Sequence, residues 1–454
     1  YFLENGNIRN IDSIEVEAKS DGISGSDSSA YGIVSYDFRN SHITNDQTAE
    51  LKITSISKSI EGISEASARG IFANNVGDDF SITNIGNIEI VATANSYDYT
   101  IVEAYGIQID DNGVYGDEGA VISNSGNINV KANGTIIDTV DGYMQLEAYG
   151  IKTGFNDESQ LNIINSGTIE AYINNQLDKR AYSLHLGNST NSDLNVTNSG
   201  ILKGNIYVDG TLTNNGTSNN KAIIELAHNA MDEDSAYISN FTNGSNGKLR
   251  IGLLTDGTIG NTKYSQLNTQ SAVFNDGSTI DVNVLSASTN QPLLAGKRLE
   301  NVVTASNNLT INDKLNITDN SALLNFKYVT SDDWINGEDG AIHLDVVKSS
   351  ENNIIDNTVS GGGNQNSQNA ATALQNVYNS NPEIQSAFNN LRSAQEVASA
   401  VQSTTALTPT ATVGATTQIS NGIAGIVTQR QNANISGGGL NSGDTMFAQK
   451  NFWF

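Results

Sequence analysis

The sequence predicts an all-β fold, a right-handed parallel β-helix followed by a C-terminal α-helical linker. Two recurring phrases carry this prediction. Ala-Tyr-Gly-Ile occurs at residues 30–33, 104–107 and 148–151, as Ala-Arg-Gly-Ile at 68–71, and in a diverged form at 181–184. Asn-x-Gly occurs at residues 84–86, 124–126, 165–167 and 198–200. Apolar residues alternate on both sides of Asn-x-Gly, as at Ile82, Ile88 and Ile90, which indicates strands with one buried face.

The spacing of the phrases indicates a repeat architecture. The first phrase recurs in steps of 38, 36, 44 and 33 residues, and the second in steps of 40, 41 and 33. We interpret each repeat as two rungs of about 20 residues, so that equivalent positions stack and the strands pair in parallel. On this interpretation about 17 rungs form a column about 80 Å long.

The phrases also predict the corners of the column. Gly accepts positive φ and Asn tolerates the left-handed region, so Asn-x-Gly predicts turns with asparagines stacked at the corners and Ile, Val and Leu inside. The tyrosines of the first phrase predict a stacked aromatic row. A sugar-binding ladder is the alternative for these tyrosines.

Composition excludes several classes of partner and site. The chain has 454 residues, no cysteine and a formal charge of −26, so bulk attraction to nucleic acid or anionic lipid is not expected. Cysteine-based disulfides, zinc fingers and nucleophiles are excluded. No apolar run is long enough for a transmembrane helix. The start at Tyr1 has no signal peptide, and we expect a processed or cropped form.

The first thirty residues fit the same fold, because Ile14, Val16 and Ala18 alternate. The serine-rich stretch 21–29 lacks Gly-x-Ser-x-Gly and a nearby histidine, which favours a solvated loop over a nucleophile. The acidic loop from Asp110 to Glu118 offers oxygen ligands for calcium, but Val114 stands where an EF-hand loop needs a ligand. We interpret it as an ordinary acidic loop.

Residues 201–350 keep strand alternation with altered spacing. Asn198 and Asn214 are 16 residues apart, which predicts single rungs here. Longer turns follow, and Trp334 is a candidate lid that packs on the core at the end of the column.

The composition changes after Lys348. A Gly and Asn break at 361–366 precedes helical spacing at 370–401. Asn381-Pro382-Glu383 predicts a helix start, and a slim helix is predicted at 408–431. A Gly-rich link at 437–439 leads to the aromatic end at 452–454.

Three segments in this order resemble a type Va autotransporter of a Gram-negative bacterium. The repeats resemble its β-helical passenger. Residues 210–217 and 264–284 resemble the pertactin-like C-terminal passenger region. Residues 407–430, with 442–444 and Phe452-Trp453, resemble the linker helix and the entry to its barrel. The resemblance implies self-secretion, in which C-terminal rungs fold first and draw the rest across the outer membrane.

This resemblance implies four segments. Residues 1–200 are the repeat β-helix passenger, 201–350 the C-terminal β-helix and autochaperone-like cap region, 351–440 the helical linker, and 441–454 the start of a truncated outer-membrane β-barrel. The implied location is the cell surface or outer membrane of a Gram-negative bacterium, with release from the cell as a further outcome.

The leading functional hypothesis is a non-enzymatic surface passenger, an adhesin or surface-structural protein. Its expected partners are a glycan or matrix protein on a host or neighbouring cell, its own outer-membrane β-barrel, and further copies of itself. A polysaccharide-degrading enzyme is one alternative, and a toxin-like secreted passenger is another. No catalytic, cofactor or metal residue is predicted. The aspartate pairs are chain neighbours that point to opposite faces of a strand, and the histidines lie far apart: His42, His185, His228 and His343.

Overall fold

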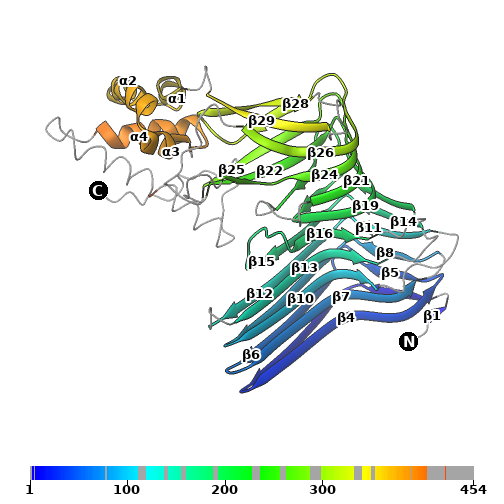
Figure 1. The fold of residues 1–454 in the computed structure, drawn as a ribbon. Helices are drawn as coiled ribbons and strands as arrows, with labels where there is room; N and C mark the ends of the chain where they lie inside the picture. The colour runs from blue at the N-terminus through cyan, green and yellow to red at the C-terminus, as the bar shows by residue number, and fades with distance from the viewer. Residues whose placement is uncertain are drawn as a thin grey trace.

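The computed structural model describes residues 3–4, 6–76, 79–110, 119–137, 142–154, 160–187, 193–227, 236–255, 262–286, 298–331, 340–348, 353–389, 391–405 and 425. These residues form a parallel β-helix, the predicted fold class, with a small group of helices at its C-terminal end. Figure 1 shows the strands stacked from the N-terminal coils in blue to the last coils in yellow.

Two sheets form the walls of the column. Sheet B holds the strands β3 (Ser13–Gly22), β6 (Glu50–Ser59), β9 (Asn87–Ser96), β12 (Asn127–Ile136), β15 (Thr168–Ile173), β18 (Ile201–Lys203), β20 (Ala222–Glu225), β22 (Gly247–Thr255), β25 (Thr279–Ser286) and β27 (Asn316–Asp319), with β23 (Thr262–Tyr264) beside β22.

Sheet A is the second wall of the column, and its strands vary in length. They are β1 (Leu3–Glu4), β2 (Asn7–Asn10), β4 (Gly25–Arg39), β5 (His42–Asn45), β7 (Ile63–Val76), β8 (Ser81–Asn84), β10 (Tyr99–Ile109), β11 (Ala120–Asn124), β13 (Tyr143–Thr153), β14 (Gln160–Asn165), β16 (Ala181–Leu186), β17 (Asp193–Asn198), β19 (Asn205–Asn214), β21 (Ala236–Asn243), β24 (Leu267–Phe274), β26 (Arg298–Ile311), β28 (Leu324–Ser331) and β29 (Gly340–Lys348).

One coil contains one whole repeat, so the prediction of two 20-residue rungs per repeat is wrong. β4 pairs in parallel with β7 at Ala30 and Ala68, and β10 pairs with β13 at Ala104 and Ala148. Each early coil has three strands, one in sheet B and two in sheet A. These strands and their turns account for the whole repeat period. Ten strands follow one another along sheet B in the described part of the chain. At about 4.8 Å per coil the column is about 45 Å long, rather than the predicted 80 Å.

A ladder of buried asparagines runs through the coils and includes the asparagines of the four predicted Asn-x-Gly corners. The side-chain Nδ2 of each ladder member up to Asn214 donates to Oδ1 of the member in the next coil, at 2.7–2.9 Å. The members are Asn10, Asn45, Asn84, Asn124, Asn165, Asn198, Asn214 and Asn243. Asn198 and Asn214 lie in adjacent coils, which confirms the predicted short coil of 16 residues.

The glycines of these corners are required for a reason that differs from the predicted one. Gly126 does not have positive φ in the structure. Instead, a Cβ on Gly126 would lie 2.0 Å from the carbonyl oxygen of Gly86 in the preceding coil, and a Cβ on Gly167 would lie 2.0 Å from that of Gly126. Close approach of stacked backbones therefore selects glycine here.

The serine-rich stretch 21–29 is also different from the prediction of a solvated loop. β3 ends at Gly22 and β4 begins at Gly25, so only a tight turn separates the two strands. Ser28 and Ser55 are buried and their hydroxyls lie 3.0 Å apart. Small hydroxyl side chains are buried at this end of the coils and hydrogen-bond one another.

The C-terminal end of the column changes to antiparallel pairing. β29 pairs antiparallel with both β26 and β28, so the final strands close on one another rather than continue the parallel stack. This arrangement pairs backbone groups at the end of the column. All strand pairs within residues 1–200 are parallel in the described part of the chain, as predicted.

Four helices follow the strands: α1 (Ile354–Ser360), α2 (Gln365–Ser380), α3 (Pro382–Asn389) and α4 (Ala394–Thr405). They enclose a separate apolar cluster that includes Leu374, Phe388 and Val401 and reaches Leu323 on the column. The Ala322 N–H donates to the Leu391 carbonyl at 2.7 Å, which ties the helices to the last coil.

The predicted helix start at Asn381 is confirmed. Its Oδ1 accepts hydrogen bonds from the N–H groups of Glu383 and Ile384 at 2.9 and 3.2 Å. Several predictions lie outside the described residues: the Trp334 lid, most of the loop from Asp110 to Glu118, the helix at 408–431 apart from residue 425, and the segment 441–454.

Candidate functional site

The tyrosines of the first phrase form a stacked row on the outer face of sheet A. The ring centroids of Tyr105 and Tyr149 are 5.2 Å apart, and those of Tyr149 and Tyr182 are 5.6 Å apart, with interplanar angles of 12° in both cases. Arg69 occupies the second position of the row, and its guanidinium carbon lies 5.1 Å from the Tyr31 ring centroid and 5.2 Å from that of Tyr105. Each copy of the phrase thus places one tyrosine ring or guanidinium in the row, where it contacts the ring or guanidinium of an adjacent coil.

Carboxylates line the same strands two residues before the tyrosines. Glu103 and Glu147 are in-register neighbours, so like charges meet in adjacent coils. Arg69 pairs with Glu103 at 3.4 Å, while the Tyr149 hydroxyl donates to Glu147 at 2.9 Å. Lys152 lies 4.5 Å from the Tyr149 ring centroid. These cations offset the repulsion between the carboxylates.

His185 extends the row beyond Tyr182. Its ring stacks on that of Tyr207 with centroids 5.1 Å apart and meets the Tyr182 ring edge-on at 4.9 Å. Burial, together with the Lys152 ammonium, lowers the pKa of His185 to about 4. Burial also raises the pKa of Tyr149 above its usual value, with Glu147 adding to this effect. Both side chains are therefore neutral near pH 7.

This geometry favours a structural role for the tyrosine row. Tyr105 and Tyr149 are only 3% and 7% exposed, and their ring faces are covered by the tyrosine rings or the Arg69 guanidinium of adjacent coils. A sugar needs an open ring face to stack on, so the centre of the row offers no platform. The structure has the stacked row that the phrase predicts, and the sugar-binding alternative lacks accessible ring faces there.

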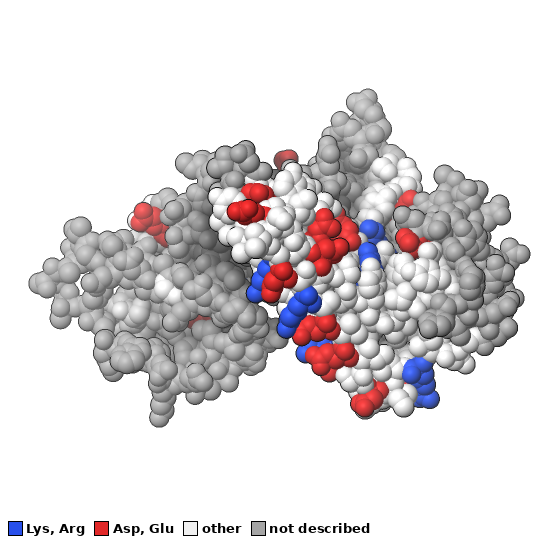
Figure 2. Space-filling view, turned by 90° about the horizontal axis from the view of Figure 1, so that it is seen from below, with Lys and Arg blue, Asp and Glu red and all other residues white. Residues whose placement is uncertain are grey.

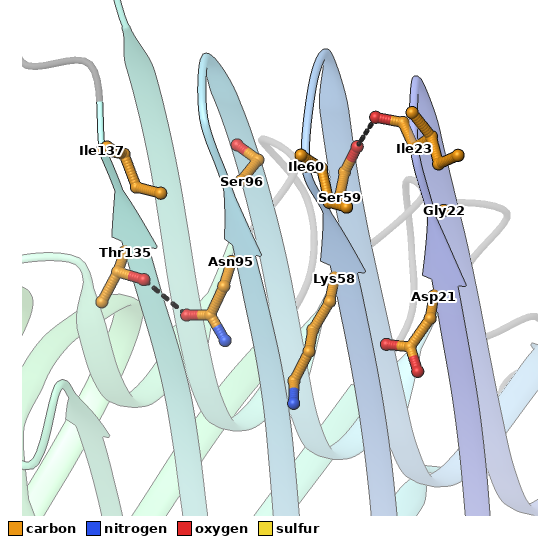
Figure 3. Close-up of a pocket in the computed structure, with 10 residues that line it drawn as sticks. All are labelled: Asp21, Gly22, Ile23, Lys58, Ser59, Ile60, Asn95, Ser96, Thr135 and Ile137. Carbon is orange, nitrogen blue, oxygen red and sulfur yellow. Dashed lines mark hydrogen bonds between the residues drawn. The ribbon is translucent and has the colours of Figure 1, made fainter.

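A second surface lies at the turns that connect sheet B to sheet A, and it is open. Two rows of side chains follow the first four coils there (Figure 3). The polar row is formed by Asp21, Lys58, Asn95 and Thr135, which are in-register neighbours on β3, β6, β9 and β12. The edge row follows two residues later and is formed by Ile23, Ile60, Tyr97 and Ile137.

A trough of about 480 Å³ lies along these rows and is lined by members of both. The Thr135 hydroxyl donates to Asn95 Oδ1 at 2.6 Å. Lys58 and Asp21 make no ion pair within the described part of the chain, although they are neighbours across the strands. The trough therefore presents an ammonium and a carboxylate on adjacent strands, beside apolar side chains.

The side chains of the edge row are unusually exposed for large apolar residues. Ile23, Ile60 and Ile137 are 70%, 67% and 71% exposed. On the other flank of the same turns, Ile63, Tyr99 and Tyr143 are also exposed and in register. We call these seven side chains the edge ridge. It contains seven of the fifteen exposed large apolar side chains found among the described residues, so exposure is concentrated here.

Sequence reasoning missed both the edge ridge and the glutamate pair. A signal existed for each. Apolar residues recur in the turns at 23, 60, 97 and 137, in steps of 37, 37 and 40, and glutamate precedes two tyrosines of the first phrase by two residues. Isolated exposed apolar residues are common, and only the stacking shows that these are neighbours.

Charged side chains of adjacent strands pair along sheet B. Arg250 bridges Glu225 at 3.3 Å and Asp281 at 2.8 Å, and Lys52 pairs with Glu15 at 3.2 Å. Figure 2 shows acidic and basic side chains side by side on the face seen from below. These pairs connect adjacent coils and stabilise them modestly.

The structure brings none of the three described histidines, His42, His185 and His343, into a cluster of metal-binding side chains, and His228 lies outside the described residues. Within the described ranges, no helix has the length and apolar character needed to cross a membrane. Comparison of the chain with protein-family models, curated proteins and solved structures found no match.

Proposed function

We propose that the chain is a non-enzymatic, surface-exposed passenger of a type Va autotransporter and acts as an adhesin or surface-structural protein. The order of repeat, cap and helical segments supports the proposal, as does the resemblance of each segment. On this proposal the chain is delivered through its own outer-membrane barrel to the surface of a Gram-negative cell. Stepwise delivery suits a column in which each coil packs mainly on the one before it.

The edge ridge is the observation that carries the adhesive role. A continuous apolar edge across four coils is costly to leave in water, at about 25 cal/mol for each Å² that a partner would cover. Such ridges mark contact surfaces in proteins. The ridge lies in the first coils, at the opposite end of the column from the helices (Figure 1). Its proposed ligand is carried on a host or neighbouring cell.

The enzymatic alternative has less support from the site geometry. Two carboxylates lie beside the tyrosine row: Glu103 is paired with Arg69 at 3.4 Å, and Glu147 accepts hydrogen bonds from Gln145 and Tyr149. These two carboxylates bind side chains of the tyrosine row, and neither of them lines the trough. The trough itself contributes a single carboxylate, from Asp21.

A binding array of glycans and matrix proteins, probed with the full chain, tests this proposal. We expect saturable binding without turnover, which is lost when Ile23→Asp and Ile60→Asp are combined. The matched control is Ile11→Asp, because Ile11 is 64% exposed but lies outside the edge ridge. Release of reducing ends from a polysaccharide would overturn the proposal in favour of an enzyme, and equal loss with the control would remove the ridge from it.

A further inference from the structure

The edge row of this ridge, formed by Ile23, Ile60, Tyr97 and Ile137, repeats at a fixed interval along the column. Its members recur once per coil, so successive side chains are about 4.8 Å apart along the axis. A surface that matches this interval over four coils must carry the same repeat. A second copy of this chain has the same repeat by construction, whereas an unrelated globular surface does not.

We infer that the edge ridge binds the ridge of a second copy in an antiparallel pair, with the first four coils of each chain overlapping. This inference rests on the proposed function and names its partner, since columns that extend from two facing cells meet antiparallel. The contact is isologous, because the same surface is used on both chains. Ile23 then lies opposite Ile137 of the other copy, and Ile60 lies opposite its Tyr97.

The polar row supports the antiparallel direction. Reversing one copy sets Lys58 opposite Asn95, whose Oδ1 accepts a hydrogen bond from Thr135 of its own copy and has a second lone pair, and sets Asp21 opposite Thr135. Each charged side chain of the polar row therefore faces a neutral polar one, and no like charges meet. In a parallel pair with the polar rows in contact, Asp21 would face Asp21 and Lys58 would face Lys58, which costs repulsion at both positions.

The net charge predicts the salt dependence of the pair. Each copy has a formal charge of −26, so two copies repel one another at long range. Salt screens that repulsion and strengthens the apolar contact. A partner attracted by charge, such as a basic protein, would instead bind more weakly as salt rises.

Sedimentation velocity on the full chain tests the association. We expect the mass to rise from 48.2 kDa toward twice that value with concentration, and more so at 300 mM than at about 20 mM salt. Ile60→Asp should weaken association at least tenfold, while Ile11→Asp should leave it unchanged. A monomer at all concentrations, or equal effects of both variants, would overturn the inference. Circular dichroism confirms that each variant keeps its strands.

Introduced cysteines test the direction of the pair. The natural chain has no cysteine, so each single variant carries one defined thiol. Under mild oxidation, a mixture of Ile60→Cys with Tyr97→Cys should form the mixed disulfide, and each variant alone should not. Ile11→Cys measures random collision. Same-residue disulfides would overturn the antiparallel direction, and yields equal to the Ile11→Cys control would overturn the contact.

These experiments use purified protein and therefore do not depend on secretion or display. Self-association that fails while array binding succeeds would leave the adhesin proposal intact and remove only the second copy as its partner. Antiparallel association without any array binding would support the pair and leave the chain without a foreign ligand.

Discussion

Replacing Asn124 by Ala tests whether the buried asparagine ladder holds the coils together. Asn124 accepts a hydrogen bond from Asn84 at 2.7 Å and donates to Asn165 at 2.8 Å. It also donates to the Thr168 carbonyl at 3.2 Å. The substitution leaves a buried donor on one side and a buried acceptor on the other, where water has no access.

The expected cost follows from these two orphaned groups. A buried polar group without its partner costs about 1–3 kcal/mol, and truncation of the side chain adds a small cavity. We expect Asn124→Ala to destabilise its coil by about 3–5 kcal/mol. The matched control is Asn127→Ala, three residues away, whose amide bonds Asn87 at 3.0 Å on the exposed surface. That variant should cost about 0.5 kcal/mol because water replaces the bond.

Hydrogen exchange with mass spectrometry is the appropriate assay, because a stack of coils opens locally rather than as one unit. Protection in β11 and β12 should fall by at least a hundredfold in Asn124→Ala, with little change in β22. The reasoning is refuted if Asn124→Ala and Asn127→Ala lower protection equally. It is also refuted if β22 loses as much protection as the substituted coil.

Three other predictions concern packing and pH. Gly126→Ala should destabilise the fold by more than about 3 kcal/mol, since its Cβ would lie 2.0 Å from the Gly86 oxygen. Gly362→Ala, where no atom lies within 4 Å, should cost only about 1 kcal/mol of φ strain in chemical denaturation. Because burial lowers the pKa of His185 to about 4, the unfolded chain binds more protons between about pH 6.5 and 4, so stability falls as the pH falls. His185→Phe should remove part of that acid sensitivity, and an unchanged pH profile of denaturation would contradict this. Burial raises the pKa of Asp319 to about 6, so here the native state binds more protons and stability falls as the pH rises from about 4 to 6. Asp319→Asn should raise stability at pH 7 by about 1–2 kcal/mol and have no benefit below pH 4, as measured by thermal denaturation across pH.

The fold class could be predicted because the repeat is visible in the sequence. Alternation at Ile88 and Ile90 indicated buried strands, and the recurring Asn124 and Asn165 indicated stacked corners, which the structure confirms. The number of coils could not be predicted in the same way. A period of 40 residues fits either two short coils or one flattened coil with three strands, and only strand pairing distinguishes them.

The contact surface could not be predicted because it depends on that coil count. With two coils per repeat, Ile23 and Ile60 would be separated by an intervening coil. In the actual stack they are neighbours, and an apolar edge results. The role of Gly126 was missed for a related reason, since the backbone that selects glycine belongs to the preceding coil.

The variation in coil length has a practical consequence. Successive ladder asparagines are separated by as few as 16 and as many as 41 residues, yet each amide meets the next at nearly the same distance. The hydrogen bonds of the ladder thus do not depend on the number of residues between successive ladder asparagines. The length of the chain between these positions is therefore free to vary. The molecule is a graduated scaffold on which foreign peptides could be inserted at chosen heights, in increments of about 4.8 Å.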